Sequence, residues 1–106
     1  MDANGATDAI CVTVNDRIAY VNRPTLGLFG MQRAEECLGH SLLELFDPDI
    51  QPILKAGIRR LLEKKSESLL IDDSKIFRRD HTLVDVSLRA VRLEWDGSPA
   101  IQVNFR

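Results

Sequence analysis

Apolar and polar residues alternate over the last quarter of the chain, with the period of a β-strand that buries one face. In residues 82–95, "TLVDVSLRAVRLEW", the face expected to be buried holds Val84, Val86, Leu88 and Ala90. Residues 100–105, "AIQVNF", repeat the pattern with Ile101, Val103 and Phe105. The intervening "DGSP" predicts a hairpin turn, so the two strands should pair antiparallel.

Three further strands are predicted. Residues 9–16, "AICVTVND", are a β-branched run that ends in a turn pair, Asn15-Asp16. Residues 17–22, "RIAYVN", follow as the second strand of a hairpin. Residues 67–79, "ESLLIDDSKIFRR", are predicted as a strand, although the acidic pair Asp72-Asp73 leaves the secondary structure of its first half unassigned.

Helical patterns occupy the middle of the chain. Asn22 is predicted to cap a short helix over 23–30, with Pro24 in its first turn and Gly30 just past its end. Residues 31–39 and 40–50 should each form a short helix. The longest helix is predicted over 49–65, with Pro52 in its first turn. Its apolar residues recur at spacings of three and four, namely Ile50, Ile53, Leu54, Ile58, Leu61 and Leu62.

This order of elements predicts an α+β domain, in which helices pack on one face of a single antiparallel sheet. With 106 residues, 44% apolar and 28% charged, the chain has room for one core, over 9–106. Residues 1–8 are polar and are expected to be a disordered N-terminal segment.

Charge and cysteine content exclude several classes of function. The net charge of −2 has no concentrated basic field, because Arg59-Arg60 and Lys64-Lys65 fit a solvated helix face, so neither nucleic-acid binding nor membrane contact is expected. No apolar run reaches the length of a membrane span, and the N-terminus is not a signal peptide. Two cysteines allow no disulfide framework and no four-cysteine zinc site. We expect a cytoplasmic protein with no metal site.

The order and spacing of several short pieces together resemble a PAS domain over about residues 8–106. The pieces are Asn22 closing the second strand, "LFG" at 28–30, "EECLGHS" at 35–41, "DP" before the long helix, and "RRDH" at 78–81. The resemblance implies a five-stranded antiparallel sheet in the order 2-1-5-4-3. It also implies a sensory input module that binds a small molecule and passes its state through the sheet. The attached effector, expected after residue 106, would be a histidine kinase, a diguanylate cyclase or a transcriptional regulator.

The residues that bind the best-known cofactors of this family are absent from this chain. Flavin-binding members carry "NCRFLQ" in the third helix, where this chain has "HSLLEL" with Leu42 at the cysteine position. Their flavin-bonding asparagines and glutamine correspond to Ile76, Val86 and Phe105. The long helix contains no histidine to ligate haem iron, and His40 fits an exposed or capping role. We therefore expect neither flavin nor haem, and the cofactor stays unknown.

An apolar pocket between sheet and helices remains as the candidate ligand site. Candidate lining residues are Asn22, Leu26, Phe29, Leu42, Ile58, Leu61, Ser74, Ile76, Val86, Leu88 and Val103. The alternative is that most of these side chains simply fill the core. Asp72, Arg78 and His40 are further polar candidates, and regular strand alternation would put Asp72 and Ser74 on the face of Ile76.

Catalysis is not expected, because the serines, histidines and acids form no recognisable nucleophile motif or phosphate-binding loop. Asp80-His81 is interpreted as an exposed turn with His81 at positive φ. A homodimer is expected through the outer sheet face, unless flanking sequence covers it. Its candidate residues are Leu83, Val91, Leu93 and Trp95. The second functional hypothesis is therefore a ligand-free dimerisation scaffold.

Overall fold

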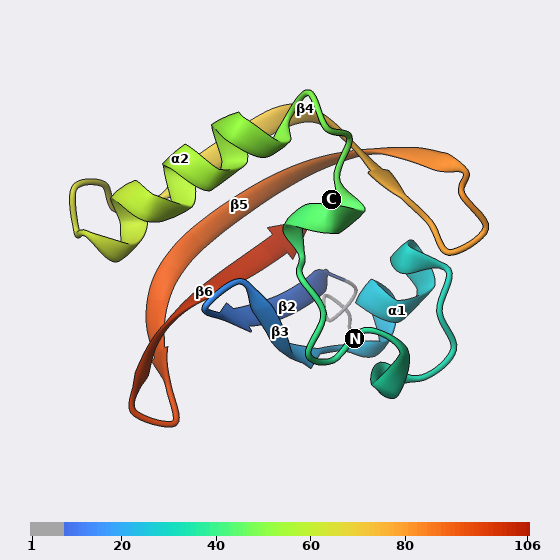
Figure 1. Ribbon diagram of the computed structural model, residues 1–106, viewed down its shortest axis with the longest axis horizontal. Helices are drawn as coiled ribbons and strands as arrows, with labels where there is room; N and C mark the ends of the chain where they lie inside the picture. The colour runs from blue at the N-terminus through green and yellow to red at the C-terminus, as the bar shows by residue number, and fades with distance from the viewer. Residues whose placement is uncertain (1–7) are drawn as a thin grey trace.

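The fold is a curved five-stranded antiparallel sheet with all helices on one side, in a computed structural model that describes residues 8–106 (Figure 1). The strands are β2 (Ala9–Val14), β3 (Arg17–Val21), β4 (Leu69–Phe77), β5 (Leu83–Trp95) and β6 (Ser98–Phe105). Their order across the sheet is β3-β2-β6-β5-β4, with every pair antiparallel. The predicted order 2-1-5-4-3 and the α+β class are confirmed. Residues 1–7 of the predicted N-terminal segment lie outside the described residues.

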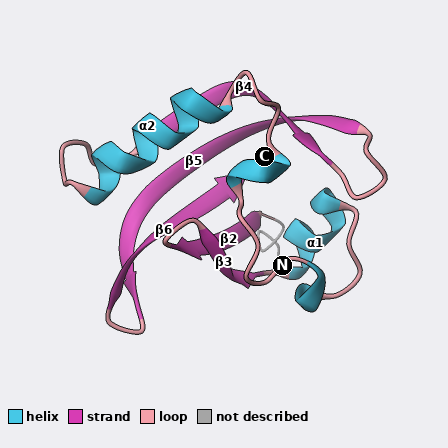
Figure 2. Cartoon of the chain, in the orientation of Figure 1, coloured by secondary structure: helices cyan, strands magenta, loops and turns pink. Residues whose placement is uncertain are grey.

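The helical layer is smaller than predicted. It consists of α1 (Arg23–Phe29), two single 3₁₀ turns, η1 (Ala34–Glu36) and η2 (Leu43–Leu45), and α2 (Gln51–Leu62), with loops between them (Figure 2). The short helices predicted over 31–39 and 40–50 are therefore wrong in length. The longest helix is also shorter than the predicted 49–65. It ends early because Lys64 adopts the left-handed φ of 61°, which stops helical hydrogen bonding. In residues 8–106, no helix is long and apolar enough to cross a bilayer.

Helix α1 begins and ends as its sequence predicts. Asn22 adopts extended backbone, and its Oδ1 accepts a hydrogen bond from the Thr25 N–H at 3.2 Å. The same Oδ1 accepts from the Ile10 N–H at 3.0 Å, which ties the helix start to β2. Gly30 closes the helix at φ 73°, a conformation that glycine adopts without strain.

The predicted alternation on β5 and β6 is confirmed, and it places the core between the sheet and the helices. Phe105 lies at the centre, 2% exposed. Its ring meets Phe29 of α1 edge-on at 5.8 Å and stacks on Phe46 at 6.2 Å between ring centroids. Cys11 and Cys37 are free thiols in the same core, as predicted. Burial raises the pKa of Cys11 to about 12, so this thiol has almost no thiolate at neutral pH.

Strand β4 contains a β-bulge that overturns one expectation. Ile71 pairs with Leu88 and Ser74 pairs with Val86, so Asp72 and Asp73 together oppose the single residue Ser87. The extra residue breaks the two-residue alternation. Ile71 and Ser74 therefore both face inward, and both aspartates are exposed. The expected shared face of Asp72 and Ser74 is wrong for this reason.

The hairpin between β4 and β5 confirms the turn predicted for Asp80-His81. His81 is exposed at φ 71°, and its N–H donates to the Arg78 carbonyl at 2.8 Å. Asp80 accepts from the Thr82 hydroxyl at 2.6 Å and from the Thr82 N–H at 3.0 Å. These two hydrogen bonds lower the pKa of the Asp80 carboxyl. The pair stabilises a turn.

We expect His81→Gly to leave the free energy of unfolding unchanged or to raise it by up to about 1 kcal/mol, because glycine adopts positive φ without strain. His81→Val at the same site should lower it by about 1–2 kcal/mol, because a β-branched residue resists that φ. Urea unfolding of the three proteins measures both effects. A larger loss for His81→Gly than for His81→Val would contradict this interpretation.

Candidate functional site

Most of the predicted pocket residues are packed in the hydrophobic core. Leu26 and Ile58 pack against the core as half-buried residues. The other apolar candidates are at most 4% exposed and belong to the core cluster: Phe29, Leu42, Leu61, Ile76, Val86, Leu88 and Val103. At the centre of the domain the alternative interpretation, a filled core, therefore accounts for them.

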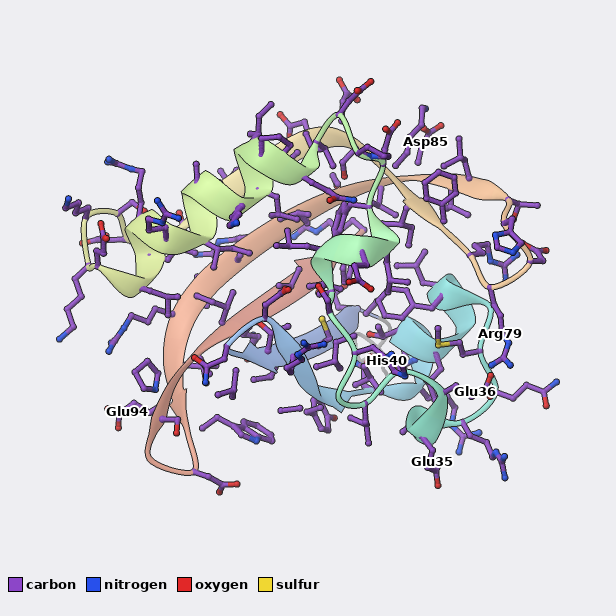
Figure 3. The ribbon with its side chains drawn as sticks, viewed as in Figure 1. Glu35, Glu36, His40, Arg79, Asp85 and Glu94 are labelled. Carbon is purple, nitrogen blue, oxygen red and sulfur yellow. The ribbon has the colours of Figure 1, made fainter. Side chains whose placement is uncertain are left out.

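Three of the polar candidates form side-chain hydrogen bonds within the protein. Asn22 caps α1, and the Ser74 hydroxyl donates to the Val86 carbonyl at 3.0 Å. Arg78 reaches from the β4–β5 hairpin to the Gly27 carbonyl at 3.2 Å. His40 is exposed on the loop between η1 and η2 (Figure 3).

An open apolar cavity of about 580 Å³ lies at one end of the domain, between α2, η2, the β2–β3 turn and the β5–β6 hairpin. Two predicted residues, Leu42 and Ile58, line it. The remaining lining residues are Thr13, Val14, Asn15, Asp16, Leu43, Lys55, Arg59, Leu62, Ser98, Pro99, Ala100 and Ile101. A volume in this range suits a small organic ligand.

Local structure holds the cavity walls in place. Asp16 lies in the β2–β3 turn at φ 65°, and its carboxylate accepts a hydrogen bond from the Ser41 hydroxyl. The Asp16 carbonyl also accepts from the Leu42 N–H at 3.3 Å, so the turn fixes the start of η2. On α2, Lys55, Ile58, Arg59 and Leu62 follow at spacings of three and four and form one helix stripe along the cavity.

A second cavity, of about 450 Å³, is lined mostly by charged and hydroxyl residues and lies where β4 and β5 meet the segment before α2. Ser74 and Val86, both predicted site residues, line it. Five aspartates surround it, with Lys75 and Arg106: Asp47, Asp49, Asp72, Asp73 and Asp85. Lys75 pairs with Asp85, which is labelled in Figure 3, and this hydrogen bond raises the Lys75 pKa. In the part of the chain that the structure describes, no three His, Cys, Asp or Glu side chains are grouped to hold a metal ion.

A further charged contact belongs to the fold. Arg79 of the β4–β5 hairpin pairs with Glu36 of η1, and the two side chains point toward one another in Figure 3. Glu36 also accepts from the backbone N–H groups of Gln32 and Arg33, at 3.1 and 3.0 Å. Desolvation would raise the Glu36 pKa, but these hydrogen bonds and Arg79 outweigh it and lower that pKa.

The outer face of the sheet carries an apolar surface around Tyr20 and Trp95, whose ring centroids are 5.7 Å apart. Val91 and Leu93 are half-buried on the same face of β5. Leu83 is 49% exposed but lies at the other end of β5, about 26 Å along the strand from Val91. Three of the four predicted interface residues, Val91, Leu93 and Trp95, thus lie together on this surface. Tyr20 also belongs to it, and Leu83 lies apart from it.

Of the residues that line this cavity, only Leu42 and Ile58 were predicted, and Lys55, Arg59 and Leu62 are the missed ones on α2. Their spacing in the stripe 55-58-59-62 could have shown that they share one face of the helix. Charged residues on such a face normally indicate that the face is exposed to solvent, so the stripe was not assigned to a cavity. Pro99 and Ala100 were missed because their place in the lining depends on which elements pack against the start of β6 in the folded domain.

Comparison with known proteins decides the family. The model of the PAS fold family matches residues 3–106. The chain belongs to the PAS family. A search of the curated proteins finds no match to the sequence. Because PAS domains are sensory modules, this places the chain in signalling.

Solved structures agree with this fold. The PAS-B domain of Cycle from Drosophila melanogaster, solved with bound ethylene glycol, superposes with a TM-score of 0.80 at 13% identity, over 92% of this chain and 97% of that one. A PAS domain from a two-component sensor histidine kinase gives 0.73 at 20% identity, over 97% and 86%. The PAS domain of nitrogen regulation protein NR(II) from Vibrio parahaemolyticus gives 0.69 at 18% identity, over 97% and 91%.

Proposed function

We propose that this PAS domain is the cytoplasmic input module of a larger signalling protein, and that it binds a small molecule in the 580 Å³ cavity. The observation that carries the proposal is the cavity itself, which is open, mainly apolar and bounded by four separate elements. The attached effector would follow residue 106. A sensor histidine kinase and a nitrogen regulation protein among the structural neighbours favour a two-component effector over a diguanylate cyclase or a transcriptional regulator.

Strand β6 connects the cavity to the end of the chain. Pro99, Ala100 and Ile101 of β6 line the cavity. At the other end of the same strand, Arg106 exchanges two backbone hydrogen bonds with Ser87, at 2.9 and 3.1 Å. A ligand that prefers one position of α2 against β6 would shift the population of sheet conformations at Arg106.

Fragment binding followed by amide NMR tests this proposal. We expect some small apolar compounds to shift the amide signals of Leu43, Ile58 and Ile101, and Leu62→Trp to abolish those shifts by filling the cavity. Leu62 is 39% exposed, so the larger side chain should not disturb the core. Ile53→Trp, at a 59% exposed position of α2 outside the cavity lining, is the control. Shifts that persist in Leu62→Trp, or their absence for all compounds, would contradict the proposal.

A dimerisation scaffold is the second candidate, favoured by the outer sheet face. We expect the domain to self-associate through Tyr20 and Trp95, and Trp95→Ala to weaken the dimer by at least about tenfold, because aromatic side chains dominate such contacts. Sedimentation equilibrium measures the dissociation constant, with Ile53→Ala as the matched apolar control on the helix side. A monomer at all concentrations, or equal effects of both variants, would contradict this hypothesis.

A further inference from the structure

The apolar cavity has a positively charged side formed by α2. Lys55 and Arg59 both line it and are one helical turn apart, about 6 Å along the axis. The ion pairs within residues 8–106 are Lys65–Glu63, Lys75–Asp85 and Arg79–Glu36, which include neither residue. Two adjacent cations beside an apolar surface are therefore without a carboxylate partner in the described chain.

The other charges near the cavity leave this positive field in place. Asp16 is the one carboxylate in the lining, and its Oδ2 accepts a hydrogen bond from the Ser41 hydroxyl. Its single negative charge, set against the two positive charges of Lys55 and Arg59, leaves the lining with a net charge of +1. Glu94 lies near the β5–β6 hairpin (Figure 3), outside the lining residues. Arg92 lies opposite Ile101 of the lining in the β5–β6 pairing, so it adds a further positive charge next to the cavity. Its Nε is buried and has no hydrogen-bond partner in the described structure. Such an atom is rare and calls for a partner.

The opposite side of the cavity is apolar. Leu42 and Ile101 are each 2% exposed and form its floor, while Ile58 and Leu62 come from the same α2 stripe as the two cations. A ligand lying here would therefore meet the apolar floor on one side, and on the α2 side it would meet two cations next to the apolar residues Ile58 and Leu62. An aliphatic carboxylate has this distribution, since its tail is apolar and its head is an anion.

We propose that this cavity binds an amphipathic organic monoanion, with its tail on the Leu42–Ile101 floor and its carboxylate at Lys55 and Arg59. This inference rests on the proposed small-molecule site and specifies its ligand class. A cation of the same shape would be repelled, and a neutral molecule would gain only the apolar part.

Three probes of equal chain length separate the charge effect from the apolar effect: octanoate, octanol and octylammonium. Titration of labelled protein, followed by the amide signals of Leu43, Ile58 and Ile101, gives each affinity. We expect octanoate to bind about tenfold more tightly than octanol, and octylammonium to bind most weakly. High salt should reduce the octanoate affinity and leave octanol unchanged, because exposed charges are screened.

Charge variants on α2 assign the head group. Lys55→Gln with Arg59→Gln should weaken octanoate about tenfold, to the level of octanol, while octanol binding stays the same. Arg60→Gln with Lys64→Gln removes the same charge from exposed positions outside the lining and should leave octanoate within about twofold of the parent protein. Both variants change exposed residues, and an unchanged amide spectrum verifies their folding.

The outcomes distinguish the two levels of the proposal. If octanol or octylammonium binds in the cavity as tightly as octanoate, the monoanion inference is wrong and the small-molecule site stands. Equal losses in the two charge variants would also overturn the inference, because they would indicate a general charge effect. If no probe shifts the lining residues, both this inference and the proposed site fail.

Discussion

Phe105→Ala is expected to lower the free energy of unfolding by about 3–5 kcal/mol, the largest effect of any single substitution considered. The ring is 2% exposed and contacts both Phe29 and Phe46, so its removal leaves a cavity that joins α1, the sheet and the segment after η2. Domains of this size have a total stability of about 5–15 kcal/mol, so the variant should lose a large share of its stability and unfold at a clearly lower temperature.

Urea unfolding monitored by circular dichroism measures this loss. Phe77→Ala is the matched control, because Phe77 is half-buried near the end of β4 and should cost less than half as much. Phe105→Leu should recover most of the stability, since leucine fills much of the volume. Equal losses for Phe105→Ala and Phe77→Ala would show that the three-ring contact does not organise the core.

Asn22→Ala should lower the free energy of unfolding by about 2 kcal/mol, which is large for a half-buried polar residue. The alanine loses one oxygen that accepts from two backbone donors, at Ile10 and Thr25. It thereby removes the helix cap and leaves the Ile10 N–H of β2 without this acceptor.

Asn22→Asp separates the acceptor from the donor. Aspartate keeps the oxygen and loses only the Nδ2 hydrogen bond to the Asp8 carbonyl, so it should cost less than half as much as alanine. Asn104→Ala, another half-buried asparagine, is the control and should change stability by at most about 0.5 kcal/mol. Thermal unfolding of the four proteins gives the comparison, and a neutral Asn22→Ala would refute the capping role.

The sequence predicts those parts of the fold that depend on local chemistry. Alternation identifies β5 and β6 because each strand has one face in the core. Asn22 and Gly30 mark the ends of α1, because the asparagine side chain can cap the first turn and glycine adopts the positive φ that ends the helix. The strand order came from the family resemblance. The bulge on β4 could not be predicted, since an extra residue in a strand is specified by its partner across the sheet.

The candidate site was predictable only in part. Apolar residues such as Leu42 and Phe29 have the same pattern whether they line a cavity or fill a core, and the structure places Leu42 at the cavity and Phe29 in the core. The charged side of the cavity depends on tertiary placement, because Lys55 and Arg59 have the spacing of any solvated helix face. Sequence patterns indicate which way a side chain points. A cavity forms where no other side chain fills the space in front of it, and that depends on the tertiary structure.

The bulge at Asp72 and Asp73 also determines where this strand can change in length. Deleting either aspartate would restore regular pairing and keep Ile71 and Ser74 on the buried face, because one residue would then lie between them instead of two. Deleting Lys75 would instead shift the alternation by one residue. Every residue of β4 on one side of the deletion would then point to the opposite face of the sheet. An alignment of this strand with a relative that lacks the bulge therefore needs a one-residue gap at 72–73. Without that gap, half of the strand would be assigned the wrong buried residues.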